Sequence, residues 1–131
     1  MEIYKFMDET PKIMIVDESE TISLITSKLF EYQHWDVTKA LTGEMALEFL
    51  QKEDFDVILM DINLPGMTGI ECCQLIRKME DKRKSRTPIF AITGNDLELT
   101  EKEYKERGFN EFFQKPTNFG LLIQKLKKIF D

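Results

Sequence analysis

The stretch VILMDINLPGMTG, residues Val57 to Gly69, combines a short apolar run with a polar end. Four consecutive apolar residues, Val57 to Met60, are typical of a strand that is covered on both faces, as in the middle of a parallel sheet. Asp61 follows where this strand leaves the core. The next residues include several turn formers, namely Asn63, Leu64, Pro65, Gly66 and Gly69. The stretch therefore predicts a carboxylate at the end of a central strand.

The composition is that of one globular domain. The chain has 131 residues, 42% hydrophobic and 32% charged, which is enough to bury a core without disulfide bonds. A formal net charge of -6 argues against a nucleic-acid surface, because phosphate binding needs clustered basic residues. One local basic cluster is interpreted as a solvated helix end: Lys82, Arg83, Lys84 and Arg86. No apolar run could span a bilayer and no signal peptide is evident, so we expect a cytoplasmic protein that binds no membrane.

The cysteines and the single histidine are given structural interpretations. Cys72 and Cys73 are adjacent and therefore poorly placed to pair with each other or to bind a metal. Cys72 is expected in the core, since it shares a helical stripe with Leu75, Ile76 and Met79. His34 precedes Trp35 in a connecting segment and is interpreted as a surface-loop residue rather than a phosphodonor or metal ligand.

Apolar strand patterns alternate with helical patterns along the chain. Strands are expected at Ile13 to Val16, Trp35 to Lys39, Val57 to Met60, Ile89 to Ile92 and Phe112 to Phe113, the second of them at an edge. The first helix is expected to be capped by Ser19, with a buried stripe of Ile22, Ile25 and Leu29. The second follows Thr42 and Gly43 and carries Ala46, Phe49 and Leu50. The third begins at the capping-box pair Thr68 and Glu71. The fourth is expected to be capped by Asn95 or Asp96, and the last to place Phe119, Leu122, Leu126 and Ile129 on one side.

This alternation predicts an α/β fold of the flavodoxin-like type. Five parallel strands in the order 2-1-3-4-5 would carry helices on both faces, joined by right-handed crossovers. Residues 12–131 would form the domain, and residues 1–11 a mobile N-terminal extension. In such sheets the reactive groups collect beyond the carboxyl ends of the strands.

The strand ends carry polar residues that suit phosphoryl chemistry. They are Asp17 and Glu18 after the first strand, Asp61 at the third, Thr93 at the fourth and Lys115 at the fifth. Three carboxylates at one edge would repel unless a cation shares the site, and oxygen ligands without Cys or His suit Mg²⁺. A lysine and a threonine beside them could hold the oxygens of a phosphoryl group, with an ionised carboxylate as nucleophile.

Four segments in order carry a resemblance to a known family: IMIVDES (13–19), VILMDINLPGMTGIE (57–71), IFAITGN (89–95) and FFQKP (112–116). Over about Lys12 to Phe130, the chain resembles the receiver domains of two-component response regulators. The resemblance implies a signalling switch rather than a conventional enzyme. A sensor histidine kinase or a histidine phosphotransfer protein would donate the phosphoryl group. The output would be a downstream protein or a domain outside this chain, and the domain would be a monomer or a phosphorylation-favoured dimer.

The resemblance also assigns roles by position. Asp61 would be the phosphoacceptor, and Mg²⁺ would be held by Asp17, Glu18, Asp61 and the backbone carbonyl of Asn63. Thr93 and Lys115 would contact the phosphoryl group, and Phe112 would turn into space that Thr93 vacates. A cis peptide is implied at Lys115–Pro116. Asn63 and Asn95 would tune dephosphorylation, and Gly94 would leave room for a phosphodonor or water.

Two positions depart from the family pattern, and three other functions are weighed against it. Glu18 stands where aspartate is usual, which puts the Mg²⁺ geometry in question, and Phe112 lacks the hydroxyl of the usual tyrosine. A degenerate receiver would act only as an interaction module without phosphorylation. A flavodoxin-type cofactor protein is disfavoured because the first loop, DESET (17–21), offers carboxylates instead of a phosphate cradle. An aspartyl-phosphate hydrolase typically has a second aspartate where this chain has Asn63.

Overall fold

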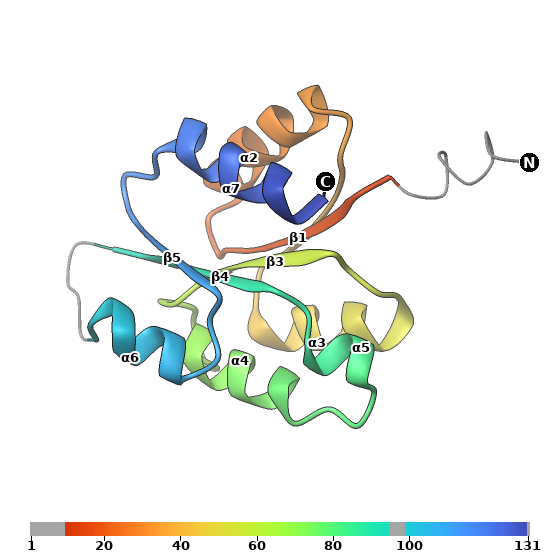
Figure 1. Ribbon diagram of the computed structural model, residues 1–131, viewed down its shortest axis with the longest axis vertical. Helices are drawn as coiled ribbons and strands as arrows, with labels where there is room; N and C mark the ends of the chain where they lie inside the picture. Colours follow the sequence, from red (N-terminus) through yellow and green to blue (C-terminus); the bar gives the residue numbers. More distant parts are fainter. Residues whose placement is uncertain (1–9, 95–98, 131) are drawn as a thin grey trace, which may run out of the picture.

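The computed structural model describes residues 10–94 and 99–130. The strands are β1 (Lys12–Val16), β2 (Asp36–Ala40), β3 (Val57–Asp61), β4 (Ile89–Thr93) and β5 (Glu111–Gln114). All neighbours pair in parallel, in the order β2-β1-β3-β4-β5 (Figure 1). The predicted flavodoxin-like topology is therefore confirmed, and β2 is the predicted edge strand.

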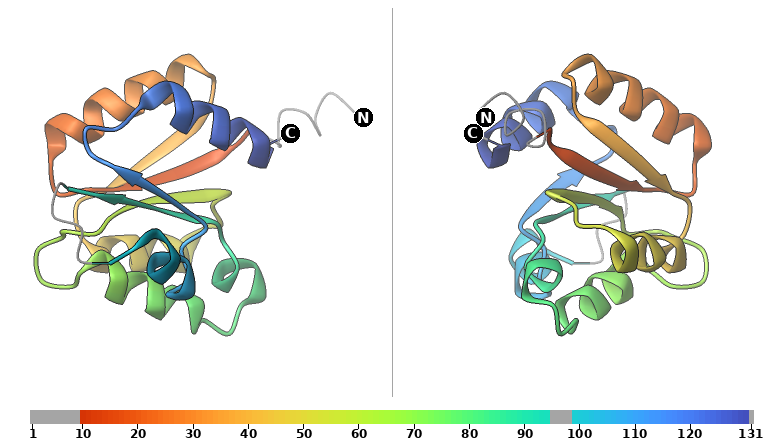
Figure 2. Two further views of the ribbon diagram at one scale, coloured as in Figure 1. Left: turned by 60° about the vertical axis from the view of Figure 1, so that its left-hand side comes forward. Right: turned by 90° about the vertical axis from the view of Figure 1, so that its right-hand side faces the viewer.

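Helices cover both faces of this sheet. They are α2 (Glu20–Tyr32), α3 (Gly43–Lys52), α4 (Gly69–Arg77), α5 (Lys82–Ser85), α6 (Glu101–Glu106) and α7 (Phe119–Phe130). Figure 2 shows α2 and α7 on one face, and the remaining helices on the other. Successive residues of β1 alternate between two cores: Ile13 and Ile15 face the α2–α7 side, and Met14 and Val16 the opposite side. Every residue of β3 and β4 is buried, as expected of central parallel strands.

Three helix starts follow the sequence. The short helix α5, which is capped by Asp81, was not predicted, and the start of α6 differs from the predicted one. The side chains of Ser19, Thr42 and Thr68 each accept a hydrogen bond from the third residue after them, as predicted, and Glu71 completes the capping box. The fourth expected helix was placed wrongly. The helix there, α6, is capped by Thr100, whose partner in a second capping box is Glu103, rather than by Asn95 or Asp96. The capping-box spacing of Thr100 and Glu103 is visible in the sequence and is a stronger signal than an isolated Asn or Asp.

The predicted buried stripe of α2 is wrong. Ile22, Ile25 and Leu29 are 43%, 49% and 37% exposed. The face that packs on the sheet consists of Ser23, Thr26, Ser27 and Phe30. Small side chains let the helix lie close to β1 and β2, and the Thr26 and Ser27 hydroxyls donate to helix carbonyls at 2.8 and 2.9 Å, so their burial leaves no polar group unpaired. Ile22, Ile25 and Leu29 thus form an exposed apolar surface on α2.

In α7 and α4, single residues also differ from their predicted burial. In α7, Ile129 is exposed, and the next residue, Phe130, packs on Trp35 with ring centroids 5.0 Å apart. In α4, Leu75 is exposed, whereas Cys72 and Cys73 are both buried. A helical stripe drifts around the helix axis, so residues at its margin are the first to be misassigned.

Three further predictions concern the N-terminal segment, His34 and membrane-spanning helices. Pro11 is already tied to the sheet, since its carbonyl accepts a hydrogen bond from the Asp36 N–H at 2.8 Å. The rest of the expected extension, apart from Thr10, lies outside the described residues. His34 follows α2 with a positive φ of 66°, in the turn that leads into β2. Within the described ranges, no helix has the length and apolarity needed to cross a membrane.

Candidate functional site

Four of the predicted site residues lie at the carboxyl edge of the sheet. Asp17 directly follows β1, Asp61 ends β3, Thr93 ends β4 and Lys115 directly follows β5. The Lys115 ammonium lies 3.1 Å from Asp61 Oδ2 and 3.7 Å from Asp17 Oδ2. Both acids are buried: Asp17 is 5% exposed and Asp61 is 4% exposed. The sheet thus brings two buried acids from strands β1 and β3 onto one lysine.

Local hydrogen bonds orient both carboxylates in the same way. Asp61 Oδ1 accepts from the N–H of Asn63 at 3.0 Å, and Asp17 Oδ1 accepts from the N–H of Ser19 at 2.9 Å. An aspartate that bonds the backbone two residues later is a turn-forming arrangement, which explains why the chain turns immediately after each strand. In each case one oxygen is held by the backbone, and the other is the one nearest Lys115.

The backbone around Asp61 is tightly packed. The N–H of Ile62 donates to the Ile92 carbonyl at 2.9 Å, so the turn stays joined to β4. Gly69 opens α4 so close to β3 that a Cβ at this position would overlap the Asp61 carbonyl oxygen. Only glycine permits this approach without moving the strand end. The glycine after the turn therefore fixes the place of the Asp61 backbone.

The lysine is held from the other side of the site. The Lys115 N–H donates to the Thr93 carbonyl at 2.7 Å, which continues the β4–β5 pairing beyond the strand ends. The Lys115–Pro116 peptide bond is cis. These contacts place the lysine side chain across β4, within reach of the carboxylates on β3 and β1.

The electrostatics of Asp61 are dominated by burial. Burial raises its pKa above the usual value for a carboxyl group, and the neighbouring Asp17 acts in the same direction. The Asn63 hydrogen bond and the Lys115 ammonium oppose this shift without cancelling it. A further cation at this edge would therefore stabilise the ionised form.

Thr93 and Phe112 occupy neighbouring strands. Thr93 is 1% exposed, and its hydroxyl lies 3.5 Å from the Gly94 carbonyl, a long contact that leaves the hydroxyl weakly engaged. Phe112 is half-buried and packs on Tyr104 of α6 with ring centroids 5.1 Å apart. Sequence reasoning missed Tyr104, whose only sequence signal is an apolar ring within a charged helix. Asn95 lies outside the described residues.

The structure brings together only some of the side chains of the predicted Mg²⁺ site. Within residues 10–94 and 99–130, no three His, Cys, Asp or Glu side chains are grouped so as to hold a metal ion. Glu18 is exposed, and the expected grouping of three carboxylates is not found within these described ranges. Asp17, Asp61 and the backbone of Asn63 nevertheless offer only oxygen ligands. This donor set fits Mg²⁺, which commonly takes one or two carboxylates and retains several waters.

A small cavity adjoins the acidic pair between α2 and α7. Its volume is about 30 Å³, and its walls include Asp61, Lys115, Ile22, Thr26 and Phe119. Ile22 thus lies beside the site although its side chain was expected in the core. No sequence pattern indicates this position of Ile22, because the position depends on how α2 is rotated about its axis.

The family model for the response regulator receiver domain matches residues 13–127. This chain belongs to that family. Receiver domains are signalling switches of two-component systems, and the predicted resemblance is confirmed. Among solved structures, the receiver domain of the Francisella response regulator 1452 is 25% identical, with a TM-score of 0.83 over 92% of this chain and 97% of that chain. The chemotaxis protein CheY4 of Vibrio cholerae is 30% identical, with a TM-score of 0.80 over 92% and 98% of the two chains.

Curated relatives include much longer sensor kinases. The CAI-1 autoinducer sensor kinase/phosphatase CqsS of Vibrio cholerae serotype O1 is 32% identical over 115 residues, which are 88% of this chain and 17% of that protein. The hybrid signal transduction histidine kinase M of Dictyostelium discoideum is 33% identical over 120 residues, 89% of this chain and 5% of that protein. This receiver domain therefore spans less than a fifth of either relative.

Proposed function

We propose that this receiver domain takes a phosphoryl group from a phosphohistidine onto Asp61 and thereby changes its surface for a protein partner. The observation that supports the proposal most directly is that the Lys115 ammonium lies 3.1 Å from buried Asp61 and 3.7 Å from buried Asp17. A lysine that only linked two strands would need one acid, whereas here two buried acids from different strands converge on the same ammonium.

The chemistry assigns one task to each group. A carboxylate oxygen of Asp61 attacks phosphorus, the bond from phosphorus to the donor imidazole nitrogen breaks, and the electron pair leaves with the imidazole. Lys115 neutralises charge on a phosphoryl oxygen, and the Thr93 hydroxyl donates to another. Mg²⁺, held by Asp17, Asp61 and the Asn63 carbonyl with Glu18 assigned to the same site, would neutralise the remaining oxygen charge.

The response to phosphorylation is proposed to run through β4 and β5. The weakly engaged Thr93 hydroxyl can exchange its 3.5 Å contact for a phosphoryl oxygen, so its movement costs little. Phe112 carries no hydroxyl, so its reorientation depends on packing against Tyr104. Phosphorylation would thus favour one of two conformations of the surface formed by α6, β5 and α7. Asn63 and Asn95 would set the lifetime of the phosphorylated state.

Intact mass after incubation with acetyl phosphate tests the proposal. We expect a gain of one phosphoryl group that requires Mg²⁺ and is lost in Asp61→Asn. Asp36→Asn, which changes an exposed aspartate on edge strand β2, is the matched control and should be phosphorylated like the parent. No gain in folded protein with ample Mg²⁺ would contradict the proposal and favour an interaction module that works without phosphorylation.

We further propose that the phosphodonor protein docks on the exposed apolar surface of α2. Ile22, Ile25 and Leu29 lie on one side of this helix, and Ile22 reaches the cavity beside Asp61. A donor that delivers a phosphohistidine to Asp61 must cover this edge of the sheet, and apolar contacts there would supply affinity.

A charged substitution on the apolar surface of α2 tests donor docking independently of the phosphorylation reaction. Ile25→Glu should slow transfer from a phosphorylated histidine phosphotransfer protein by roughly ten-fold or more, because a carboxylate would be buried at the interface. The same variant should react with acetyl phosphate at the parent rate. Equal slowing with both donors would instead indicate damage to the site, and unchanged transfer would place the donor elsewhere. Glu48→Gln on α3, which lies on the other face of the sheet, serves as a control.

A further inference from the structure

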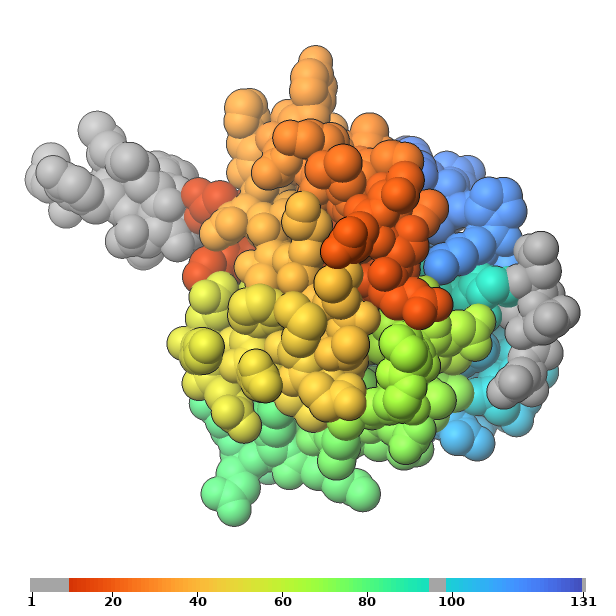
Figure 3. Space-filling model, turned by 180° about the vertical axis from the view of Figure 1, so that it is seen from behind, coloured from red at the N-terminus to blue at the C-terminus, as the bar shows by residue number. Residues whose placement is uncertain are grey.

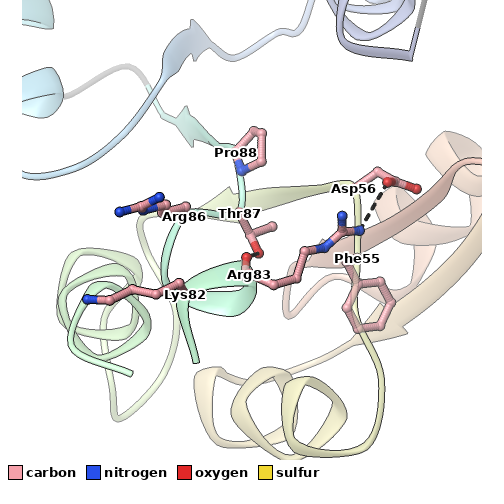
Figure 4. Close-up of a pocket in the computed structure, with 7 residues that line it drawn as sticks. All are labelled: Phe55, Asp56, Lys82, Arg83, Arg86, Thr87 and Pro88. Carbon is pink, nitrogen blue, oxygen red and sulfur yellow. Dashed lines mark hydrogen bonds and ion pairs between the residues drawn. The ribbon is translucent and has the colours of Figure 1, made fainter. Parts of the chain in front are cut away.

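The basic cluster at α5 forms a pocket on the side of the molecule away from Asp61. It is lined by Phe55, Asp56, Lys82, Arg83, Arg86, Thr87 and Pro88 and has a volume of about 340 Å³ (Figure 4). These residues precede β3 and β4, whereas Asp61 and Thr93 end them. The green segment that contains α5 lies along the lower rim in Figure 3, where it is open to solvent. The pocket is thus separate from the proposed phosphorylation chemistry.

Two cations of this pocket have no carboxylate partner in the part of the chain that the structure describes. Asp56 is already engaged, because its Oδ2 accepts from the Lys12 N–H at 2.8 Å and its Oδ1 lies 3.3 Å from Arg83 Nη2. Among the described residues, neither Lys82 nor Arg86 has a carboxylate within 4.0 Å.

Helix geometry places these two cations side by side. The Arg86 N–H donates to the Lys82 carbonyl at 3.2 Å, so the residues are one turn apart. Figure 4 shows both side chains extending to the same side of α5. Like charges at this spacing repel each other, and an anion shared between them would remove the repulsion. Arg83 and the Thr87 hydroxyl lie beside them on the pocket wall.

We propose that this pocket binds a small phosphorylated ligand. Guanidinium groups match phosphate oxygens in pairs, and an ammonium beside them adds a point charge. The volume lies within the range of small-molecule sites, and Phe55 and Pro88 add an apolar wall. A diphosphate group supplies enough anionic oxygens to engage Lys82 and Arg86 together. Its source is either an inorganic diphosphate or the diphosphate of a nucleotide.

Titration of the ¹⁵N-labelled protein with pyrophosphate and with ADP tests this proposal. The experiment uses low salt without divalent cations, so it needs neither Mg²⁺ nor phosphorylation and can succeed or fail independently of the proposed function. We expect saturable shifts of the Phe55 and Thr87 amides, with a Kd of about 1 mM or tighter. Tighter binding of ADP would assign a nucleotide, and equal binding an inorganic diphosphate.

Matched variants decide whether the cations are responsible. Arg86→Gln and Lys82→Gln should each weaken binding roughly five-fold or more. Arg107→Gln should not, although Arg107 is likewise an exposed residue at the C-cap of a short helix. Shifts that do not saturate, or that persist in Arg86→Gln, would overturn the proposal. So would tighter binding of a polyglutamate peptide than of either phosphate compound, which would assign an acidic protein segment instead.

Discussion

Asp61 shows how burying one carboxyl group can lower the stability of a fold. Its pKa is raised chiefly by burial, and Lys115 and the Asn63 N–H offset this only in part. A carboxyl whose pKa is higher in the folded state stabilises the fold below its unfolded pKa of about 3.9, and this contribution is lost as the pH rises through the folded value. At neutral pH the ionised Asp61 is therefore less favourable in the fold than in the unfolded chain.

Asp61→Asn should raise the thermal stability at neutral pH. We expect the midpoint of unfolding to rise by a few degrees at pH 7.5, and the difference from the parent to shrink as the pH falls through the raised pKa of Asp61. Circular dichroism melts across this pH range measure both effects, with Asp36→Asn as the control for a solvent-exposed aspartate. A lower midpoint at pH 7.5 would mean that the Lys115 ion pair outweighs the cost of burial.

At the scale of elements, α2 shows where sequence patterns mislead. Its most apolar residues point outward, and its buried face is made largely of hydroxyl-bearing residues. The hydroxyls of Thr26 and Ser27 donate hydrogen bonds to carbonyls of their own helix. Ser23 is only 1% exposed, and its Oγ has no hydrogen-bond partner among the described residues. Burying a hydroxyl without a partner costs free energy, so this position is a weak point of the helix.

Ser23→Ala should therefore stabilise the domain. The expected gain is about 1 kcal/mol, because the substitution removes an unpaired buried hydroxyl and places a better helix former in the interior of α2. Urea unfolding at neutral pH measures it. Ser27→Ala is the matched control: this hydroxyl is also buried but donates to the Leu24 carbonyl, so its removal should gain less. A loss of stability in Ser23→Ala would show that the hydroxyl has a partner such as an ordered water.

At the scale of the whole molecule, the packing of α4 on one face of the sheet buries both cysteines. Cys72 and Cys73 are 0% exposed, and burial raises their pKa values to about 12 and 11. Thiolate is the reactive form, so neither thiol should react while the domain is folded. Their reaction instead reports the opening of α4 from the sheet.

Iodoacetamide at pH 8 should leave both thiols unmodified in the native protein and label both in urea. The rate under native conditions should follow global unfolding, because α4 is buried on the side that carries both cysteines. Mass spectrometry after timed quenching measures the labelled fraction. A cysteine introduced at Tyr32, which is 82% exposed, provides an accessible thiol for comparison. Rapid labelling of Cys72 or Cys73 in the native protein would reveal local opening of α4.

The sequence by itself determined the order of elements and the candidate phosphorylation site. Strand and helix periods alternate clearly, parallel connections have one favoured hand, and polar residues at the strand ends must meet at one edge of the sheet. These features made the positions of Asp61 and Lys115 predictable. The pattern of α2 was not decisive, since an apolar stripe marks a face without saying whether the sheet or a partner covers it.

Only the tertiary structure decided which surfaces close and which remain open. The approach of α2 to the sheet selected its small residues for the inside and left Ile22 and Ile25 outside, whereas Glu18 stays exposed beside two buried acids. The pairing of Arg83 with Asp56 left Lys82 and Arg86 without carboxylate partners among the described residues. Sequence spacing fixes neighbours along one element, but contacts between elements depend on helix rotation and separation, which packing of the whole domain determines.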